Sequence, residues 1–192
     1  MYKLRGFTLI ELLVVLAIAA ILATLAAPSM VSLIQSNAIT GNVNQFLADL
    51  RYTRSEAIRR GGNVVMCRSN APEASSPSCG TGTGPGNNGW VSGWVIFHDL
   101  NADGGIDSGE PILRVQSAIT NVNSIVQGGS SSSTKFKFTA TGRLTSVSSS
   151  ASFQFGSNPP YPNTTQRVVC LSVGGRARIA GDGYASCGAS GE

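Results

Sequence analysis

Acidic side chains gather in one short stretch of the chain, DLNADGGIDSGE, between residues 99 and 110. Their spacing fits the calcium-loop template D-x-N-x-D-G-x5-E, in which alternate positions supply oxygen ligands and a glycine makes a sharp turn. Hard oxygen ligands at this spacing select calcium over softer metals. The template therefore predicts a structural calcium ion held by Asp99, Asn101, Asp103, Gly105, Asp107 and Glu110.

The surroundings of this loop differ from those of a helix-loop-helix calcium site. Hydrophobic residues typical of a strand precede the loop, and Pro111 follows it directly. The alternative interpretation is an Asx-rich surface turn whose carboxylates face water. Apart from this calcium ion, the sequence indicates no cofactor.

A second group of charged side chains lies late in the chain, in the stretch VGGRARIAG. Arg176 and Arg178 are two residues apart, so an extended backbone would place them on one face. Paired guanidinium groups on one face can hold phosphates. The alternative is that these charges merely keep an edge strand soluble. Four further basic residues could widen such a patch, namely Lys135, Lys137, Arg143 and Arg167.

Residues for enzymatic catalysis are sparse. His98 is the only histidine, and no serine or cysteine stands in a nucleophile motif around it. We interpret His98 as an exposed turn residue. Phosphate-binding and dinucleotide-binding glycine motifs are also absent from the sequence. The sequence predicts a protein that is not an enzyme.

Four cysteines, Cys67, Cys79, Cys170 and Cys187, all lie in the second two thirds of the chain. They permit three pairings. We favour Cys67 with Cys79 and Cys170 with Cys187 because each of these pairs closes a short loop. The zinc alternative fails on spacing, since the chain has no CxxC pair and one histidine. Disulfides would require an oxidising compartment such as the periplasm.

The elements that position these sites can also be predicted from the sequence. The first is an apolar stretch, GFTLIELLVVLAIAAILATLAAP, from Gly6 to Pro28. Its length approaches the roughly 20 residues of a membrane-spanning helix. Lys3 and Arg5 precede it, which predicts a cytoplasmic N-terminus and an exported remainder. A removable signal peptide is the competing interpretation, but no small-x-small cleavage site follows the run. Glu11 is costly in a membrane unless it is paired, so it is a candidate functional residue.

The stretch KLRGFTLIELLVVLAIAAILATLAAPSM resembles the N-terminus of the type IV prepilin and type II secretion pseudopilin superfamily. The resemblance implies that prepilin peptidase cuts between Gly6 and Phe7 and that the new Phe7 amine is methylated. It also implies that Glu11 meets the N-terminal amine of a neighbouring subunit during filament assembly. An ammonium group is the partner that would offset a carboxylate in lipid. Other pilin or pseudopilin subunits are the expected partners.

Beyond Pro28, apolar side chains recur at three- and four-residue spacing, as on one face of a helix; they are Ile39, Val43, Phe46, Leu50, Thr53 and Ala57. The end of this helix is crowded by Arg51, Arg54, Arg59 and Arg60, a cluster that could meet an anionic partner or only complement the helix dipole. Gly61 and Gly62 favour a stop.

The predicted organisation is therefore a leader at 1–6, a helix at 7–60 and a β-rich domain at 61–192. The helix divides into a transmembrane part at 7–27 and an amphipathic part at 28–60. Strands are expected at 63–67, 90–97, 112–115, 124–126, 135–139, 152–155 and 167–173, with Gly and Ser between several of them. The fold class is α+β, with the long helix packed on antiparallel sheets.

Within the superfamily, the β-rich domain resembles the minor pilins and pseudopilins called FimT, FimU and GspH. The resemblance rests on the block WVIFHDLNADGGIDSGE and on two strands with Gly-Arg pairs, Gly142-Arg143 and Gly175-Arg176. It implies a minor type IV pilin that primes or caps a pilus, or alternatively a GspH-type pseudopilin that acts in protein secretion. Arg176 and Arg178 also resemble the GRxR motif of pilins that bind DNA for natural transformation. The expected location is the inner membrane, with a periplasmic domain, and then the filament.

Overall fold

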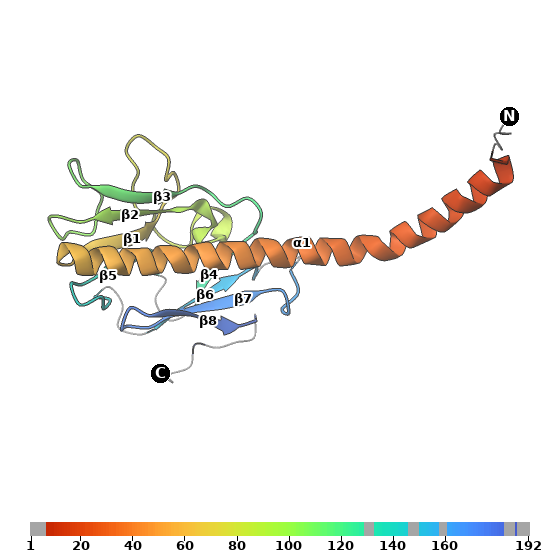
Figure 1. Ribbon diagram of the computed structural model, residues 1–192. Helices are drawn as coiled ribbons and strands as arrows, with labels where there is room; N and C mark the ends of the chain where they lie inside the picture. Colours follow the sequence, from red (N-terminus) through yellow and green to blue (C-terminus); the bar gives the residue numbers. More distant parts are fainter. Residues whose placement is uncertain (1–6, 129–132, 146–149, 158–160, 183–186, 188–192) are drawn as a thin grey trace, which may run out of the picture.

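The computed structural model describes residues 7–128, 133–145, 150–157, 161–182 and 187, with the backbone alone at 25–28. Its dominant element is one helix of 52 residues, α1 (Leu9–Arg60). The helix begins at an N-cap, Thr8, and ends at Gly61, whose left-handed backbone (φ 84°) suits glycine. Its N-terminal half projects away from the rest of the molecule and curves, while its C-terminal half lies along the globular domain (Figure 1).

The two halves of α1 differ in what covers them. Every described side chain from Leu9 to Ile34 is exposed, although most are large and apolar. The first buried residue is Ile39, and all six residues of the predicted amphipathic stripe are buried. A fragment that begins near Ser36 would therefore keep every buried side chain of the described chain. The N-terminal half contributes nothing to this core.

The globular domain contains two antiparallel four-stranded sheets, with α1 laid across both (Figure 1). The first sheet has the order β3-β2-β1-β5, with β1 (Val64–Arg68), β2 (Trp94–His98), β3 (Ile112–Gln116) and β5 (Lys135–Phe138). The second has the order β4-β6-β7-β8, with β4 (Ile125–Gly128), β6 (Ala151–Phe155), β7 (Arg167–Leu171) and β8 (Ala177–Gly181). This arrangement confirms the predicted fold class.

The strand predicted at 90–97 is only partly correct. Trp90–Ser92 form a short 3-10 turn, η2, and β2 starts at Trp94. Gly93 separates them with φ 99°, and a side chain there would lie 2.4 Å from the carbonyl oxygen of Gln116. A second 3-10 turn, η1, spans Pro85–Asn87. His98 is not a turn residue, because it ends β2 and is half-buried.

The core is built around an aromatic side chain of α1. The ring of Phe46 contacts Trp90, Trp94, Phe153 and Phe155 at centroid distances of 4.8 to 5.6 Å, mostly edge to face. Two of these rings come from before or within the first sheet, and two come from β6 of the second. One helix residue thus joins both sheets, which explains why the amphipathic half of α1 is fixed on the domain.

A buried carboxylate also ties α1 to the first sheet. Asp49 is fully buried, accepts a hydrogen bond from Trp94 Nε1 at 2.9 Å and pairs with Arg114 Nη1 at 2.6 Å. The Arg114 guanidinium also lies over the ring of Tyr52, 4.2 Å from its centroid. Because a buried charge needs partners, Trp94 and Arg114 hold this face of α1 in one position.

Candidate functional site

The start of α1 presents Glu11 in a closed local arrangement. Its carboxylate accepts from the backbone N–H of Thr8 at 2.9 Å and from the Thr8 hydroxyl at 2.8 Å, while Thr8 Oγ1 caps the Glu11 N–H. This reciprocal pattern is a capping box. By length and composition, α1 is the helix that could cross a membrane within the described residues. Phe7 is exposed, and Gly6 lies outside the described residues.

The cysteines are joined in the two pairs favoured from the sequence. Cys67 pairs with Cys79, and Cys170 pairs with Cys187. The first pair fixes the loop after β1 against the outer face of the first sheet, where Cys79 and Ile106 cover Val65 and Phe97. The loop between β2 and β3 is thus packed through Ile106 rather than held by charged groups alone.

The acidic loop at 99–110 is ordered by its own side chains. Asp99 accepts from the Gly104 N–H at 3.0 Å, Asn101 from the Asp103 N–H at 3.1 Å, and Asp103 from the Gly105 N–H at 2.6 Å. The Gly105 N–H also holds the pKa of Asp103 below its usual range, because it bonds to the charged form. Glu110 accepts from the N–H groups of Leu100 and Asp107 and so closes the loop.

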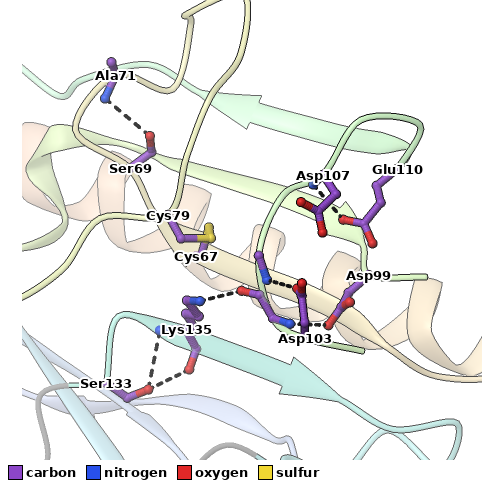
Figure 2. Close-up of a disulfide and its surroundings, with 12 residues drawn as sticks. Cys67, Ser69, Ala71, Cys79, Asp99, Asp103, Asp107, Glu110, Ser133 and Lys135 are labelled. Carbon is purple, nitrogen blue, oxygen red and sulfur yellow. Dashed lines mark hydrogen bonds between the residues drawn. A yellow bond between two sulfur atoms is a disulfide. The ribbon is translucent and has the colours of Figure 1, made fainter. Parts of the chain in front are cut away.

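Two lysines from β5, Lys135 and Lys137, supply positive charge to this loop. Figure 2 shows Lys135 beside the loop that carries Asp99 and Asp103. Lys137 Nζ lies 3.0 Å from Asp99 Oδ2, and Lys135 Nζ lies 2.5 Å from the carbonyl oxygen of Gly104. The Asn101 amide bridges Asp103 and Asp107 at 3.1 and 2.9 Å. Among the described residues, no group of three or more acidic, cysteine or histidine side chains is placed to hold a metal ion. Because Lys135 and Lys137 bond to the loop at 99–110, they do not widen a basic patch around Arg176.

The two Gly-Arg pairs noted in the sequence meet in space. Gly142 and Gly175 both have left-handed backbones, with φ 72° and 74°. A side chain at Gly175 would lie 2.0 Å from the carbonyl oxygen of Gly142, and one at Gly142 would lie 2.7 Å from Arg54 Nε. The Leu144 N–H also donates to Val173 O at 2.9 Å. Gly175 is needed because its turn packs directly on Gly142, and Gly142 is needed because the Arg54 side chain of α1 lies against it.

The turn between β7 and β8 fixes the backbone of Arg176. The Ser172 N–H donates to Arg176 O at 2.9 Å, and Ser172 Oγ accepts from the Arg176 N–H at 3.3 Å. Arg178 lies within β8, opposite Cys170. Both arginine side chains are exposed. β8 starts at Ala177, so Arg176 precedes the strand instead of lying in it.

A surface pocket of about 390 Å³ separates this turn from α1. We call it the α1–β8 pocket; its lining includes Arg51, Arg54 and Ile58 from α1 and Gly175, Arg176 and Ala177 from the turn and β8. Arg178 does not line it. The sequence showed the arginines of α1 as one cluster and Arg176 as another. Their juxtaposition joins residues more than a hundred positions apart, which no local pattern indicates.

Replacing Gly175 by alanine is expected to lower the free energy of unfolding by about 2 kcal/mol or more, since alanine adds left-handed strain and meets the Gly142 carbonyl. Gly174→Ala is the matched control, because its side chain would find only ordinary contact, 3.7 Å from Ser172 Oγ. Urea unfolding of the fragment from Ser36 measures both. Equal stability of the two variants would show that the turns do not pack as described.

Fold and site together define a structural class: a long N-terminal helix with an exposed apolar half, whose second half packs on two antiparallel sheets joined to disulfide-closed loops. Two family models match the chain. The model described as Type II transport protein GspH matches residues 42–175, and the Prokaryotic N-terminal methylation motif matches residues 1–27. The chain belongs to the GspH family of pilin-like proteins. Such subunits assemble with other pilins and are processed by prepilin peptidase.

Solved structures share the fold. Two crystal forms of the type IV minor pilin FimU from Pseudomonas aeruginosa PAO1 are similar, each at 20% sequence identity. The P21 form has a TM-score of 0.54 and covers 79% of this chain and 94% of FimU. The P65 form has a TM-score of 0.50 and covers 77% of this chain and 97% of FimU. A comparison with curated proteins found no match. At this identity the likeness concerns the fold.

Proposed function

We propose that this chain is a minor type IV pilin, anchored in the inner membrane with its globular domain in the periplasm until it joins a filament. The observation that supports this most is the exposed apolar half of α1, which needs lipid or neighbouring helices to cover it. Two disulfides suit an oxidising compartment. The subunit would prime or cap the pilus through Phe7 and Glu11.

The second candidate is a type II secretion pseudopilin, favoured by the description of the matching family model. The two roles differ in what the filament does. We expect the protein to appear in pili sheared from cells and its deletion to reduce piliation while secretion stays normal. If deletion abolished protein secretion and left pili unchanged, the pseudopilin assignment would replace the pilin assignment.

We further propose that Arg176 and Arg178 bind DNA during natural transformation, contacting phosphates without sequence preference. The support is electrostatic. Five arginines lie in no ion pair within the described part of the chain: Arg51, Arg54, Arg143, Arg176 and Arg178. Arg51, Arg54 and Arg176 line the α1–β8 pocket, and Arg54 also lies against Gly142. Exposed guanidinium groups without acidic partners attract phosphates. Arg143 adjoins the site through Gly142, whereas Arg167 donates to the carbonyl oxygens of Thr164 and Gln166.

The variant Arg176→Gln, Arg178→Gln is expected to enter filaments normally but to lose at least tenfold in DNA affinity, because two phosphate contacts disappear. Fluorescence anisotropy with labelled duplexes of two unrelated sequences measures this on the full chain in a non-ionic detergent. The control Arg59→Gln, Arg167→Gln removes equal charge elsewhere. An equal loss in the control would reduce the effect to net charge and contradict the proposed site.

We propose separately that the loop at 99–110 binds calcium, and the supporting observation concerns Asp99. Its Oδ1 atom is buried and has no hydrogen-bond partner, although Oδ2 contacts Lys137 and the Gly104 N–H. Calcium would use this oxygen with Asn101, Asp103, Asp107, Glu110 and the Gly105 carbonyl, after the Asn101 amide turns its oxygen inward. Such binding requires the carboxylates to move together.

Calcium should then raise the melting temperature of the fragment from Ser36, and a chelator should reverse the rise. The variant Asp103→Asn, Asp107→Asn should remove the response, and magnesium should not replace calcium. The same melting temperature with calcium and with chelator would mean that Lys137 already balances the loop and that no ion is bound.

A further inference from the structure

The α1–β8 pocket combines charge and apolar surface in one place. Three arginines, Arg51, Arg54 and Arg176, line it from two elements. Ile58, whose side chain is 52% exposed, and Ala177 add apolar lining. A pocket with guanidinium groups beside apolar lining suits a ligand that carries an anionic group next to a less polar one.

The arginines of α1 differ in whether their charge is already used. Arg59 and Arg60 both bond to Glu56, and these bonds hold the pKa of Glu56 below its usual range. Arg51 and Arg54 lie in no ion pair of the described chain. The helix therefore neutralises the arginines at its very end and leaves those that line the pocket uncompensated.

The pocket is also held in shape before any ligand arrives. Arg54 lies against Gly142 and donates to the Gly175 carbonyl oxygen at 3.4 Å. Ser172 fixes the backbone of Arg176 through both its N–H and its hydroxyl group. The far wall is a continuous helix. A preformed site loses less conformational entropy on binding than a flexible one.

We propose that the α1–β8 pocket binds the phosphate backbone of DNA, with Arg51 and Arg54 of the helix and Arg176 of the turn each contacting a phosphate. This inference rests on the proposed DNA binding and adds two residues outside the Gly-Arg-x-Arg stretch. The adjoining deoxyribose packs against Ile58 and Ala177. DNA then passes from the helix over the turn toward Arg178 and does not follow β8 alone.

Phosphate could also come from lipid headgroups, but the position of the pocket disfavours that source. Arg51 lies two dozen residues beyond Ala27, which at the helical rise is roughly 36 Å from the end of the expected membrane segment. Headgroups of the membrane that carries α1 are therefore out of reach. The helix residues that line the pocket, Arg51, Arg54 and Ile58, belong to the last turns of α1. This end of the helix lies on the globular domain, far from the half that projects away (Figure 1).

The test compares full-length variants in a non-ionic detergent by anisotropy with a labelled DNA duplex over a range of salt. Arg51→Gln, Arg54→Gln should weaken DNA binding at least tenfold at low salt and reduce the slope of log affinity against log salt by about 1.8, because two phosphate contacts are lost. Arg59→Gln, Arg167→Gln is the charge-matched control, since both arginines lie outside the pocket and already bond to other groups of the protein, and it should change affinity less than twofold.

Each alternative result would contradict a different part of the proposal. If wild type binds DNA and only the Arg176, Arg178 variant is weakened, the helix arginines are not part of the site, while the proposed function stands. If wild type does not bind, both proposals fail. If poly-glutamate competes as well as DNA at equal charge concentration, the pocket selects negative charge in general and the phosphate assignment is wrong. Binding of the fragment from Ser36, which lacks the apolar half of α1, to anionic lipid vesicles as strongly as to DNA would likewise contradict it.

Discussion

Replacing Arg114 by leucine is expected to lower the free energy of unfolding by about 3–5 kcal/mol, the largest single effect among the described side chains that we consider. The reason is the carboxylate left behind. Asp49 is fully buried between α1 and the first sheet, and without Arg114 it keeps Trp94 Nε1 and the Gln45 amide as its neighbours. A buried charge without a counter-charge is far more costly than a lost contact.

Removing the other partner, Asp49, should lower the free energy of unfolding by less. Asp49→Ala leaves Arg114, whose side chain is 40% exposed and can turn toward water, and orphans only the Trp94 N–H, at about 1–3 kcal/mol. Urea unfolding of the fragment from Ser36, followed by tryptophan fluorescence, measures both variants and the double variant. The double variant should be more stable than Arg114→Leu alone. Equal losses for the two single variants would contradict the asymmetry, with Glu73→Ala as a surface control.

Replacing Glu11 by alanine is expected to reduce incorporation into filaments by about a hundredfold or more. We propose that the carboxylate pairs with a neighbouring subunit's N-terminal amine, and removing one partner of such a pair in lipid costs about 3–5 kcal/mol. Anchoring should persist, because the apolar half of α1 is unchanged. Immunoblots of the sheared filament fraction and of membranes measure the two quantities.

A control is needed because Glu11→Ala also breaks the capping box at the start of α1. Thr8→Ala breaks the same box, since the hydroxyl group that caps the Glu11 N–H is lost, but keeps the carboxylate. It should assemble nearly normally. If Thr8→Ala failed to assemble as severely as Glu11→Ala, the helix cap and not the charge would explain the defect.

The sequence predicted those features that depend on nearby residues. The apolar run with Glu11, the buried stripe from Ile39 to Ala57 and the stop at Gly61 follow local rules of composition, spacing and capping. Most strands were placed to within a few residues. The start of β2 was misplaced because Trp90, although aromatic, packs into the core from a 3-10 turn and not from a strand.

What escaped prediction depends on distant contacts. Asp49 meets Trp94 and Arg114 from 45 and 65 residues away, and Arg54 meets Gly175 from 121 residues away. Arg68 was missed for a related reason, since it ends a buried strand and supports the loop after it by donating to Asn70 Oδ1 and Thr81 O. Its burial lowers the pKa of its guanidinium. Pairings of this kind are fixed by the tertiary fold, not by spacing.

The measurement that tests the central claim most directly is the salt dependence of DNA binding by the wild-type full chain. If the arginine-lined end of this filament subunit contacts phosphates through Arg51, Arg54, Arg176 and Arg178, duplexes of unrelated sequence should bind equally. Affinity should then fall by a factor of about 100 between about 50 and 200 mM salt, with a logarithmic slope near −3.5. Absence of binding at the lower salt concentration, or binding that ignores salt, would contradict the claim.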